Sequence, residues 1–379
     1  MKKIILIPDS FKGTMGSSDI CAIMKKEVIK YYPNCNVVSI PVADGGEGSV
    51  ECFLQAVGGS SVNITANNPH FEPMQSFYGI INKGDTAVVE MAAAAGLPLV
   101  EGRRNPLVTT TYGVGELIKH ASQSGVKKII VGLGGSATND VGCGAAAACG
   151  VRFYNSKNDS FIPTGGTLID VSRIDISGLD PALAGIEIVA MCDIDNPMYG
   201  STGAAHIFGP QKGATTPELV ATLDRGLVHI SKIIERDLGQ SVHEIPGSGA
   251  AGAMGAGMIA FFGAKLQMGI ESVLDTVRFD DELKTADLVI TGEGRIDGQS
   301  LRGKVVIGVA RRSKKANVPV VAVVGDIGEN MDGAYDEGVS SIISINRVAV
   351  EFPIAKTRSR SDLALTIDNL MRFCHRMGL

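Results

Sequence analysis

Residues 2–8, KKIILIP, form a short apolar run of the kind that becomes a buried strand. A second run of this kind, ADLVITG, occupies residues 286–292, close to the other end of the chain. Near both runs, apolar stretches of strand length alternate with stretches whose apolar residues recur at helical spacing. Because this alternation is typical of a parallel α/β sheet, we expect the two ends of the chain to build one sheet together.

The same patterns predict the other elements at both ends. Helices are expected over residues 18–32, about 47–57, 304–315 and 361–377, and strands over residues 36–42, 318–325 and 340–345. The second helix should end at Gly58 and Gly59, because glycine readily adopts the backbone conformation that closes a helix.

The middle of the chain has a different pattern. Three apolar runs joined by turn residues, at 61–67, 74–81 and 85–92, predict successive antiparallel strands. Strands over 127–133 and 186–193 and helices over 112–122 and 217–238 follow in a less regular order. The fold class that we expect is α/β, with a discontinuous Rossmann-like parallel-sheet domain and a second, inserted mixed α/β domain.

The predicted Rossmann-like domain consists of residues 1–63 and 284–379, and residues 64–283 form the inserted domain. Ligands of open α/β sheets bind beyond the carboxyl ends of the parallel strands. We therefore expect the active site in the cleft between the two domains.

The composition excludes several classes of protein. The net charge of −5 disfavours a nucleic-acid-binding surface, and the first apolar run is too short for a signal peptide. One uncharged stretch, residues 246–264, carries six glycines, which predicts a closely packed buried helix rather than a membrane span. Seven cysteines without a C-x-x-C pair are typical of the cytoplasm, and the six histidines lack metal-ligand spacing. We expect a cytoplasmic protein that binds neither nucleic acid nor membrane; a homo-oligomer stays open.

Polar, glycine-rich clusters follow five of the predicted strands. They are PDSFKGTM (8–15), PVADGGEGS (41–49), GLGGSATND (132–140), CDIDNPMYG (192–200) and TGEGRIDGQS (291–300). A single cluster of this composition is more often a turn, but five at strand ends predict a site. Phosphoryl transfer needs amides and cations around phosphates, carboxylates for Mg²⁺ and a carboxylate beside the attacking hydroxyl, and these clusters contain all of them.

Three glycine motifs do not meet the requirements of the nucleotide-binding motifs that they resemble. GSGAAG (247–252) has no convincing strand before it, and GLGGSA (132–137) has no acidic residue at the distance that a ribose contact requires. GQSLRGKV (298–305) places valine where a P-loop needs serine or threonine. Gly303 and Lys304 nevertheless open a helix, whose N-terminus is suited to an anion.

Nine sequence blocks occur in order along the chain. They are IPDSFKGT, PVADGGEGS, EMAAAAGL, TTYGVGELI, GLGGSATND, CDIDNPMYG, GAAHIFGPQKGA, PGSGAAGAMG and ADLVITGEGRID. Through them the chain resembles the bacterial type I glycerate kinase family from about residue 3 to residue 325. The resemblance implies the same discontinuous two-domain fold. Departures such as Val141, where the family tends to have glycine, remove no charged group.

The resemblance implies ATP-dependent phosphorylation of D-glycerate, with Mg²⁺ as the metal and 2-phosphoglycerate as the product. Several alternatives stay open: phosphorylation of the 3-hydroxyl, a kinase of another small hydroxy acid, a hydride-transfer enzyme, and a metabolite-binding regulator on the same fold.

The clusters at the N-terminal strands provide candidates for binding substrate and metal. Lys12 is expected to hold the glycerate carboxylate or the transferring phosphate, and Asp9 and Ser10 are expected to orient the hydroxyl groups. Asp44 is a candidate Mg²⁺ ligand.

Asp193 ends an apolar strand, where a carboxylate is costly to desolvate without a partner. We expect it to orient or deprotonate the glycerate hydroxyl. Asp195, two residues on, is the alternative base or a metal ligand.

The remaining candidates concern the phosphates. Gly134, Gly135 and Ser136 are expected to bind phosphate through backbone amides, and Asp140 is expected to cap the next helix in preference to contacting Mg²⁺. The expected cations are Lys212 and Lys304 for the nucleotide phosphates and Arg295 for the transferring group, and Glu293 is expected to bind metal or hold Arg295.

Overall fold

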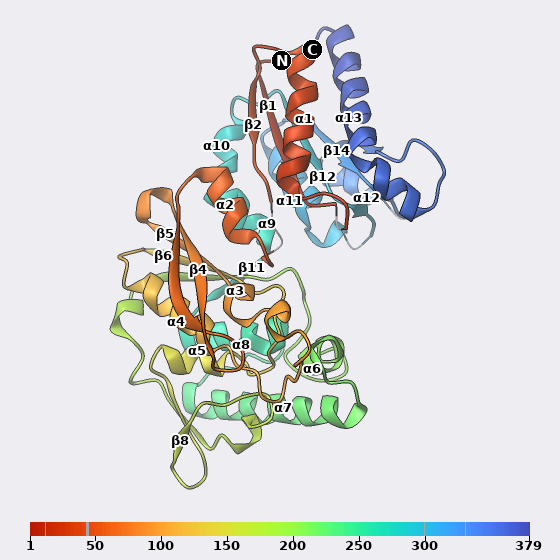
Figure 1. The fold of residues 1–379 in the computed structure, drawn as a ribbon. Helices are drawn as coiled ribbons and strands as arrows, with labels where there is room; N and C mark the ends of the chain where they lie inside the picture. Colours follow the sequence, from red (N-terminus) through yellow and green to blue (C-terminus); the bar gives the residue numbers. More distant parts are fainter. Residues whose placement is uncertain (12, 43–44, 299, 330) are drawn as a thin grey trace. The chain divides into compact units, whose positions relative to one another are not determined.

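A computed structural model describes the chain except residues 12, 43–44, 299 and 330 (Figure 1). The chain forms two compact units. Unit 1 consists of Met1–Ala43, Gln55–Val57 and Ile270–Leu379, and unit 2 of Asp44–Leu54 and Gly58–Gly269.

The bounds of the units differ from those of the predicted domains. Residues 45–54 and 58–63, which the sequence assigned to the Rossmann-like domain, belong to unit 2. The second of these stretches does so because the strand β3 (Ser60–Asn67) pairs along its whole length with β4 (Pro73–Ile81). Residues 270–283 belong to unit 1, where Arg312 forms ion pairs with Glu271, Asp275 and Asp280.

Unit 1 contains the parallel sheet expected from both ends of the chain. Its order is β16 (Val339–Ser344), β14 (Val320–Val324), β12 (Leu288–Gly292), β1 (Lys3–Pro8) and β2 (Asn36–Ser39). All four pairings are parallel, and β1 lies directly beside β12. The prediction that residues 2–8 and 286–292 share one sheet is confirmed.

Helices pack on both faces of this sheet. Because successive strand residues point to opposite faces, they contribute to two separate cores. Val321 and Val323 pack with α1 (Ser17–Tyr31) and α13 (Phe352–Arg376), whereas Ala322 and Val324 pack with α11 (Val305–Lys315) and α12 (Asp332–Asp336). Figure 1 shows α1 and α13 side by side. Helix α13 begins at Phe352 rather than at residue 361, and Pro353 in its first turn suits a helix start.

Unit 2 is built on a mixed sheet of six strands. Its order is β11 (Lys265–Gln267), β10 (Glu187–Met191), β6 (Lys128–Gly132), β5 (Thr86–Glu90), β4 and β3. Strands β11, β10, β6 and β5 are parallel, and β5, β4 and β3 form the antiparallel series predicted from the sequence.

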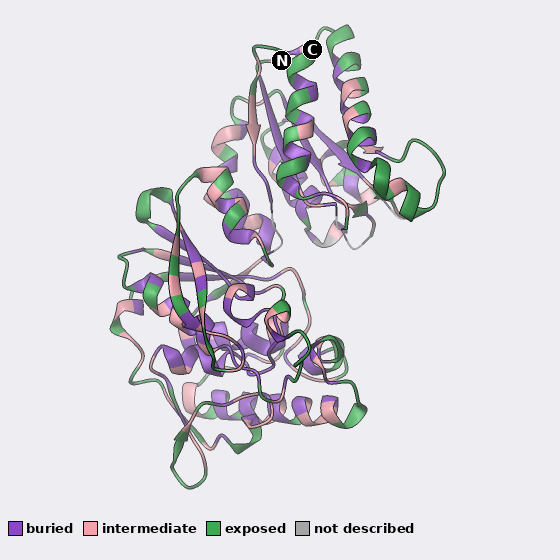
Figure 2. Cartoon of the chain, viewed as in Figure 1, coloured by how far each residue is buried: buried purple, intermediate pink, exposed green. Residues whose placement is uncertain are grey.

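Two hydrophobic cores stabilise unit 2. One lies between the sheet and α4 (Tyr112–Ser122), α5 (Cys143–Ala148) and α8 (Ala250–Phe262). The other lies under α7 (Pro217–Leu238). Figure 2 shows buried and exposed residues alternating along this helix. A three-stranded sheet, β8 (Ser160–Phe161), β7 (Arg152–Tyr154) and β9 (Arg173–Asp175), contributes to the second core.

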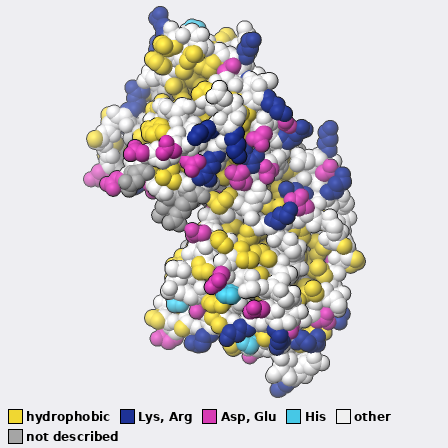
Figure 3. All heavy atoms as spheres, turned by 180° about the vertical axis from the view of Figure 1, so that it is seen from behind, with side chains coloured by type: hydrophobic (Ala, Val, Ile, Leu, Met, Phe, Trp, Pro, Cys, Tyr) yellow, Lys and Arg dark blue, Asp and Glu magenta, His cyan; other side chains and the backbone are white. Residues whose placement is uncertain are grey.

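The remaining elements are short. They are α2 (Ser49–Val57), α3 (Ala92–Ala95), α6 (Ala204–Phe208), α9 (Gly269–Thr276), α10 (Phe279–Leu283), β13 (Arg295–Ile296) and β15 (Asp326–Ile327). On the face drawn in Figure 3, cationic and anionic side chains are interspersed. In the described part of the chain, no helix has the length and hydropathy needed to span a bilayer.

The contact between α4 and α5 depends on a glycine. A Cβ atom added at Gly115 would lie 2.3 Å from the carbonyl oxygen of Ala145. We expect Gly115→Ala to lower the free energy of urea unfolding by more than about 2 kcal/mol, because one of the two backbones must move. Gly16→Ala is the control, since no atom lies within 4 Å of its added Cβ, and it should change this free energy by less than about 1 kcal/mol. If both substitutions lowered the free energy of unfolding equally, the close contact between Gly115 and Ala145 would not explain the effect of Gly115→Ala.

Candidate active site

The carboxyl ends of β1 and β12 bring Asp9, Ser10 and Glu293 to one edge of the sheet in unit 1. Pro8 pairs with Gly292 in the parallel register, and the Asp9 amide donates to the Gly292 carbonyl at 2.8 Å. Asp9 and Glu293 follow these two paired residues directly. Asp9 and Glu293 are 284 positions apart in the sequence, and each follows a predicted strand. The pairing of β1 with β12 makes them neighbours. Lys12, predicted in the same loop, lies outside the described residues.

Glu293 is the least satisfied acid of this edge. Its side chain is 5% exposed, and its Oε1 atom has no hydrogen-bond partner among the described residues. Burial raises the pKa of Glu293 to about 7, and the charges of Asp9 and Asp297 add to the rise while Ser300 and Lys304 oppose it. A buried carboxyl group with an unused oxygen at a strand end is typical of a ligand site.

The two cations expected near Glu293 are both accessible. Arg295 is 62% exposed and forms ion pairs with Asp297 at 3.8 Å and with Asp326 at 3.6 Å. Asp326 lies on β15, which pairs with the strand of Arg295, β13. Lys304 is exposed and precedes the first residue of α11 as its N-cap, as the sequence predicted.

Three parallel strands of unit 2 direct polar residues to a common edge. Glu90 ends β5, the glycine loop follows β6, and Asp193 follows β10, with Gly132 paired to both Glu90 and Met191. The rule that placed the expected site at carboxyl strand ends thus applies to unit 2 as well.

The glycines of the loop after β6 allow its backbone to approach the backbone of Gly45 and Gly46 closely. A Cβ atom on Gly132 would lie 2.4 Å from the Gly45 carbonyl oxygen, and one on Gly134 would lie 2.5 Å from the Gly46 Cα. The Gly134 amide donates to the Gly45 carbonyl at 2.9 Å, so it is already used. Gly135 is exposed and has φ +73°, a left-handed conformation that favours glycine.

The next two amides, of Gly135 and Ser136, are not used in hydrogen bonds to the described backbone. Leu97 donates to the Gly135 carbonyl at 2.9 Å and Ala137 donates to the Ala95 carbonyl at 2.8 Å. The amides of Gly135 and Ser136 themselves donate to no carbonyl in the described part of the chain. Two of the three residues predicted to bind phosphate therefore keep a usable donor.

Lys212 lies beneath this loop. It ends a short 3₁₀ helix (Pro210–Lys212), is only 1% exposed, and donates from Nζ to the Ser136 Oγ and the Thr138 carbonyl, both at 2.7 Å. Burial lowers the pKa of Lys212 to about 7, although the nearby charge of Asp140 opposes the shift. The structure thus brings together two residues that the sequence could only nominate separately.

Asp140 is a structural residue. Its fully buried carboxylate accepts hydrogen bonds from the amide and hydroxyl of Thr111, both at 2.8 Å, and from the amides of Gly142 and Gly144 at the start of α5. Asp140 thus satisfies amides at the start of α5, as the sequence favoured over Mg²⁺ binding, although the N-cap residue itself is Gly142.

The glycine fingerprint GSGAAG supports the same loop from the other side. A Cβ atom on Gly252 would lie 2.0 Å from the Thr138 carbonyl oxygen, and the Val141 amide donates to the Gly252 carbonyl at 3.2 Å. Val141, which stands where the family tends to have glycine, has φ +60° and is fully buried. A β-branched residue in this conformation is strained, so its surroundings must hold it there.

Asp193 is anchored beyond the end of its strand. Strand β10 ends at Met191, and the half-buried Asp193 accepts a hydrogen bond at Oδ1 from the Gly269 amide at 2.7 Å. Asp195 is exposed, and because the strand has ended, strand alternation does not fix its side chain on the same side as that of Asp193. Burial raises the pKa of the intervening Cys192 to about 11, so its thiol is not a nucleophile at neutral pH.

The sequence missed three polar residues at this edge. Glu90 is 3% exposed and accepts hydrogen bonds from the amides of Gly48 and Val50 at the start of α2. Thr138 and Asn139 are fully buried, and their side-chain polar atoms have no hydrogen-bond partner among the described residues. The signal for Glu90 was the one used for Asp193, an acid at the end of an apolar strand. Asp44 lies outside the described residues.

Comparison with known proteins identifies the family of the chain. The profile described as the Glycerate kinase family matches residues 4–375. The chain belongs to the glycerate kinase family. A glycerate kinase of Bacillus cereus (strain ATCC 10987 / NRS 248) is 42% identical over 97% of each chain. A glycerate 2-kinase of Escherichia coli (strain K12) is 42% identical over 90% of each.

A solved structure shows the same fold. The crystal structure of a Salmonella typhimurium LT2 protein that carries the name glycerate kinase 2 superposes with a TM-score of 0.88. The two chains are 39% identical, and the match covers 100% of this chain and 99% of that one. The resemblance and the α/β fold class predicted from the sequence are confirmed. As a glycerate kinase family member, the chain is a phosphotransferase whose acceptor is an alcohol group.

The buried ammonium of Lys212 predicts how stability depends on pH. Its pKa falls from 10.5 to about 7 on folding, so between these values the unfolded chain binds more protons than the folded one. The free energy of unfolding should therefore rise from pH 7 to pH 10, with Lys212 contributing up to about 1.4 kcal/mol per pH unit.

Urea unfolding of wild type and Lys212→Met across this pH range measures the effect. The substitution should remove the Lys212 part of the slope, whereas Lys157→Met, at an exposed lysine, should leave the slope unchanged. If Lys212→Met retained the wild-type slope, the ammonium would not be the group responsible.

Proposed function

We propose that the chain uses ATP and Mg²⁺ to phosphorylate the 2-hydroxyl of D-glycerate. The observation that carries the proposal is the match to the family over residues 4–375, together with 42% identity to a relative named glycerate 2-kinase. The polar groups at the carboxyl strand ends of both units support it. A cytoplasmic location remains a prediction from composition.

In unit 2, the amides of Gly135 and Ser136 are proposed to bind a phosphate group. Lys212 supports them by holding the Ser136 hydroxyl, and its burial suits a role in positioning the loop rather than an exposed contact with the nucleotide. Gly134 contributes its lack of a side chain, because its amide is bonded to the Gly45 carbonyl.

Asp193 is proposed to orient the glycerate hydroxyl and to accept its proton. The hydrogen bond from the Gly269 amide fixes the carboxylate in one orientation, which a group that positions a hydroxyl requires. Asp195 is proposed as the alternative base or a metal ligand, since it is exposed two residues further on.

In unit 1, Asp9 and Ser10 are proposed to bind substrate hydroxyls and Glu293 to hold Mg²⁺. The unpartnered Oε1 of Glu293 fits a hard cation, because Mg²⁺ binds carboxylate oxygens. Bound Mg²⁺ would neutralise charge on the ATP phosphates. Lys304 and Arg295 are proposed to hold the nucleotide phosphates and the transferring group, and Lys12 and Asp44 remain predictions for substrate and metal.

The product identifies the hydroxyl that reacts. Incubation with ATP, Mg²⁺ and D-glycerate should give the phosphorus NMR signal of 2-phosphoglycerate. Asp193→Asn should lower kcat by about 10²- to 10⁴-fold, the usual effect of losing a general base, with the KM for ATP little changed. Asp195→Asn should lower kcat far less. A 3-phosphoglycerate signal would contradict the assigned hydroxyl, and a larger loss in Asp195→Asn would exchange the roles of the two aspartates.

Removing the charge of Glu293 should make the protein more stable and, at the same time, weaken its use of Mg²⁺. Its pKa rises from 4.5 to about 7 on folding, so its contribution to stability is present below pH 4.5 and is lost as the pH rises through 7. At pH 8 in EDTA, Glu293→Gln should therefore raise the free energy of unfolding by on the order of 1–3 kcal/mol.

The same variant should need about tenfold more free Mg²⁺ for half-maximal rate at saturating ATP, because one metal ligand has lost its charge. The control, Glu244→Gln, changes a side chain that is 89% exposed and should behave as wild type in both measurements. If Glu293→Gln were less stable than wild type and its Mg²⁺ requirement were unchanged, Glu293 would have a structural role and would not bind the metal.

A further inference from the structure

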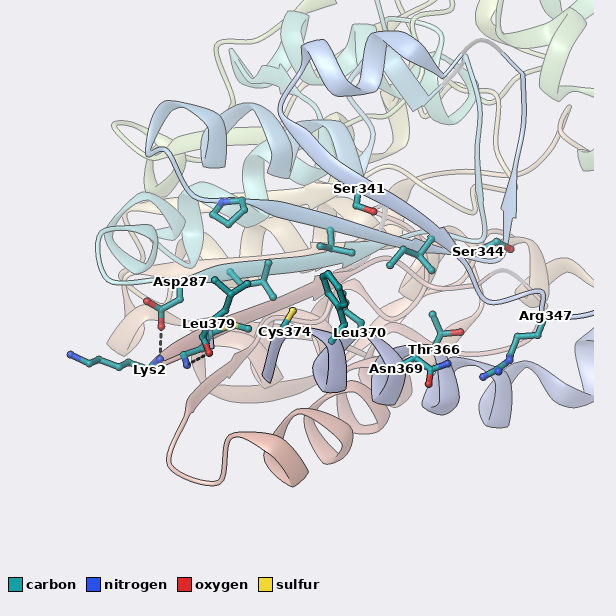
Figure 4. Close-up of a pocket in the computed structure, with 16 residues that line it drawn as sticks. Lys2, Asp287, Ser341, Ser344, Arg347, Thr366, Asn369, Leu370, Cys374 and Leu379 are labelled. Carbon is teal, nitrogen blue, oxygen red and sulfur yellow. Dashed lines mark hydrogen bonds between the residues drawn. The ribbon is translucent and has the colours of Figure 1, made fainter. Parts of the chain in front are cut away.

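A groove opens on one face of the sheet in unit 1, beside the C-terminal helix. Helix α13 packs against α1, and beyond it a cavity of about 1190 Å³ lies over β14 and β16 (Figure 4). Its lining includes Val321 from β14, Ile343 from β16 and Leu370 from α13. Parallel sheets normally have helices over both faces, and here α13 leaves a cavity over part of β14 and β16 that a ligand could fill.

The floor and wall of the groove are apolar. Val321 and Ile343 line the groove from the sheet, and Leu370 and Phe373 line it from α13. Phe373 is 62% exposed, although it stands beside a hydrophobic core. An apolar body placed in the groove would cover these side chains, with a gain of roughly 0.8 kcal/mol for each CH₂ group buried.

The charged groups of the groove lie at its two ends, with Lys2 and Asp287 at one end and Arg347 at the other. Arg347 is exposed there and has no carboxylate partner in the described part of the chain. Asp287, the one acid among the described lining residues, lies at the opposite end in Figure 4. Its Oδ2 atom accepts hydrogen bonds from the amides of Lys2 and Lys3, so its charge is used locally.

Polar side chains accompany the arginine. Thr366 and Asn369, on consecutive turns of α13, lie beside Arg347 in Figure 4. The side chains of Arg347 and Asn369 form no hydrogen bond or ion pair with any described residue. A guanidinium, an amide and a hydroxyl at one end of an apolar groove provide the donors that a carboxylate needs.

We propose that this groove binds an amphipathic monocarboxylate. Its carboxylate pairs with Arg347 and accepts hydrogen bonds from Asn369 and Thr366, and its aliphatic body covers Val321, Ile343, Leu370 and Phe373. Charge complementarity favours a single anionic head at Arg347, because the other end of the groove contains both Lys2 and Asp287, whose opposite charges offset each other. The site uses no residue of the proposed reaction, so it can be tested independently of kinase activity.

Calorimetric titration of the full chain with decanoate, and separately with decan-1-ol, tests the proposal. Decanoate should bind saturably with one site per chain and about tenfold more tightly than the alcohol, because only the acid pairs with Arg347. Arg347→Gln should weaken decanoate binding about tenfold and leave decan-1-ol binding unchanged. Arg376→Gln, at the end of α13 and outside the groove lining, should bind both probes as wild type does.

A second exposed position tests the apolar part. Phe373→Glu should weaken both probes, and should weaken decanoate more, since it places a like charge in the groove. Absence of saturable decanoate binding would overturn the proposal, as would equal effects of the two arginine substitutions. A dimer in sedimentation velocity that Phe373→Glu dissociates, without decanoate binding, would assign the groove to a second copy of the chain.

Discussion

Close contact between two stretches of backbone determines the arrangement at the carboxyl edge of unit 2. Gly132 and Gly134 meet Gly45 and Gly46 at distances that leave no room for a Cβ atom. This contact uses the Gly134 amide, whereas the amides of Gly135 and Ser136 donate to no backbone carbonyl of the described residues. It also brings the first turn of α2 within reach of Glu90, whose carboxylate then accepts two amides of that turn. A side chain at either glycine would displace the loop and the start of the helix together.

Buried charges in the two units differ in how fully they are satisfied, and this difference separates structural from functional roles. Asp140 receives hydrogen bonds from four donors and serves to cap a helix. Lys212 donates two hydrogen bonds and supports the loop above it. Glu293 retains an oxygen with no partner among the described residues. Because an unsatisfied buried polar atom costs about 1–3 kcal/mol, its retention at a strand end favours a ligand as the missing partner.

The sheet of unit 1 presents two different surfaces, each with its own chemistry. Its carboxyl edge, at β1 and β12, carries Asp9 and Glu293 and is charged. The face of β14 and β16 beyond α13 is apolar, with Arg347 at one end. The edge suits Mg²⁺ and phosphate, whereas the face suits an aliphatic chain with a carboxylate. The parallel arrangement of the strands supplies both surfaces, since it aligns all carboxyl ends and leaves a broad flat face for helices to cover.

The sequence by itself determined the α/β class, the shared sheet of the two chain ends and the candidate residues Asp9, Ser136, Asp193, Lys212 and Glu293. These follow from local patterns, because apolar periodicity marks strands and parallel strands align their carboxyl ends. Only the tertiary structure decided that Lys212 contacts Ser136, that Gly134 spends its amide on Gly45, and that residues 58–63 and 270–283 join the units they do. It also revealed Asn139 and Glu90. Contacts between segments far apart in the sequence leave no local pattern, and burial, which shifts the pKa values of Lys212 and Glu293, exists only once both units have folded.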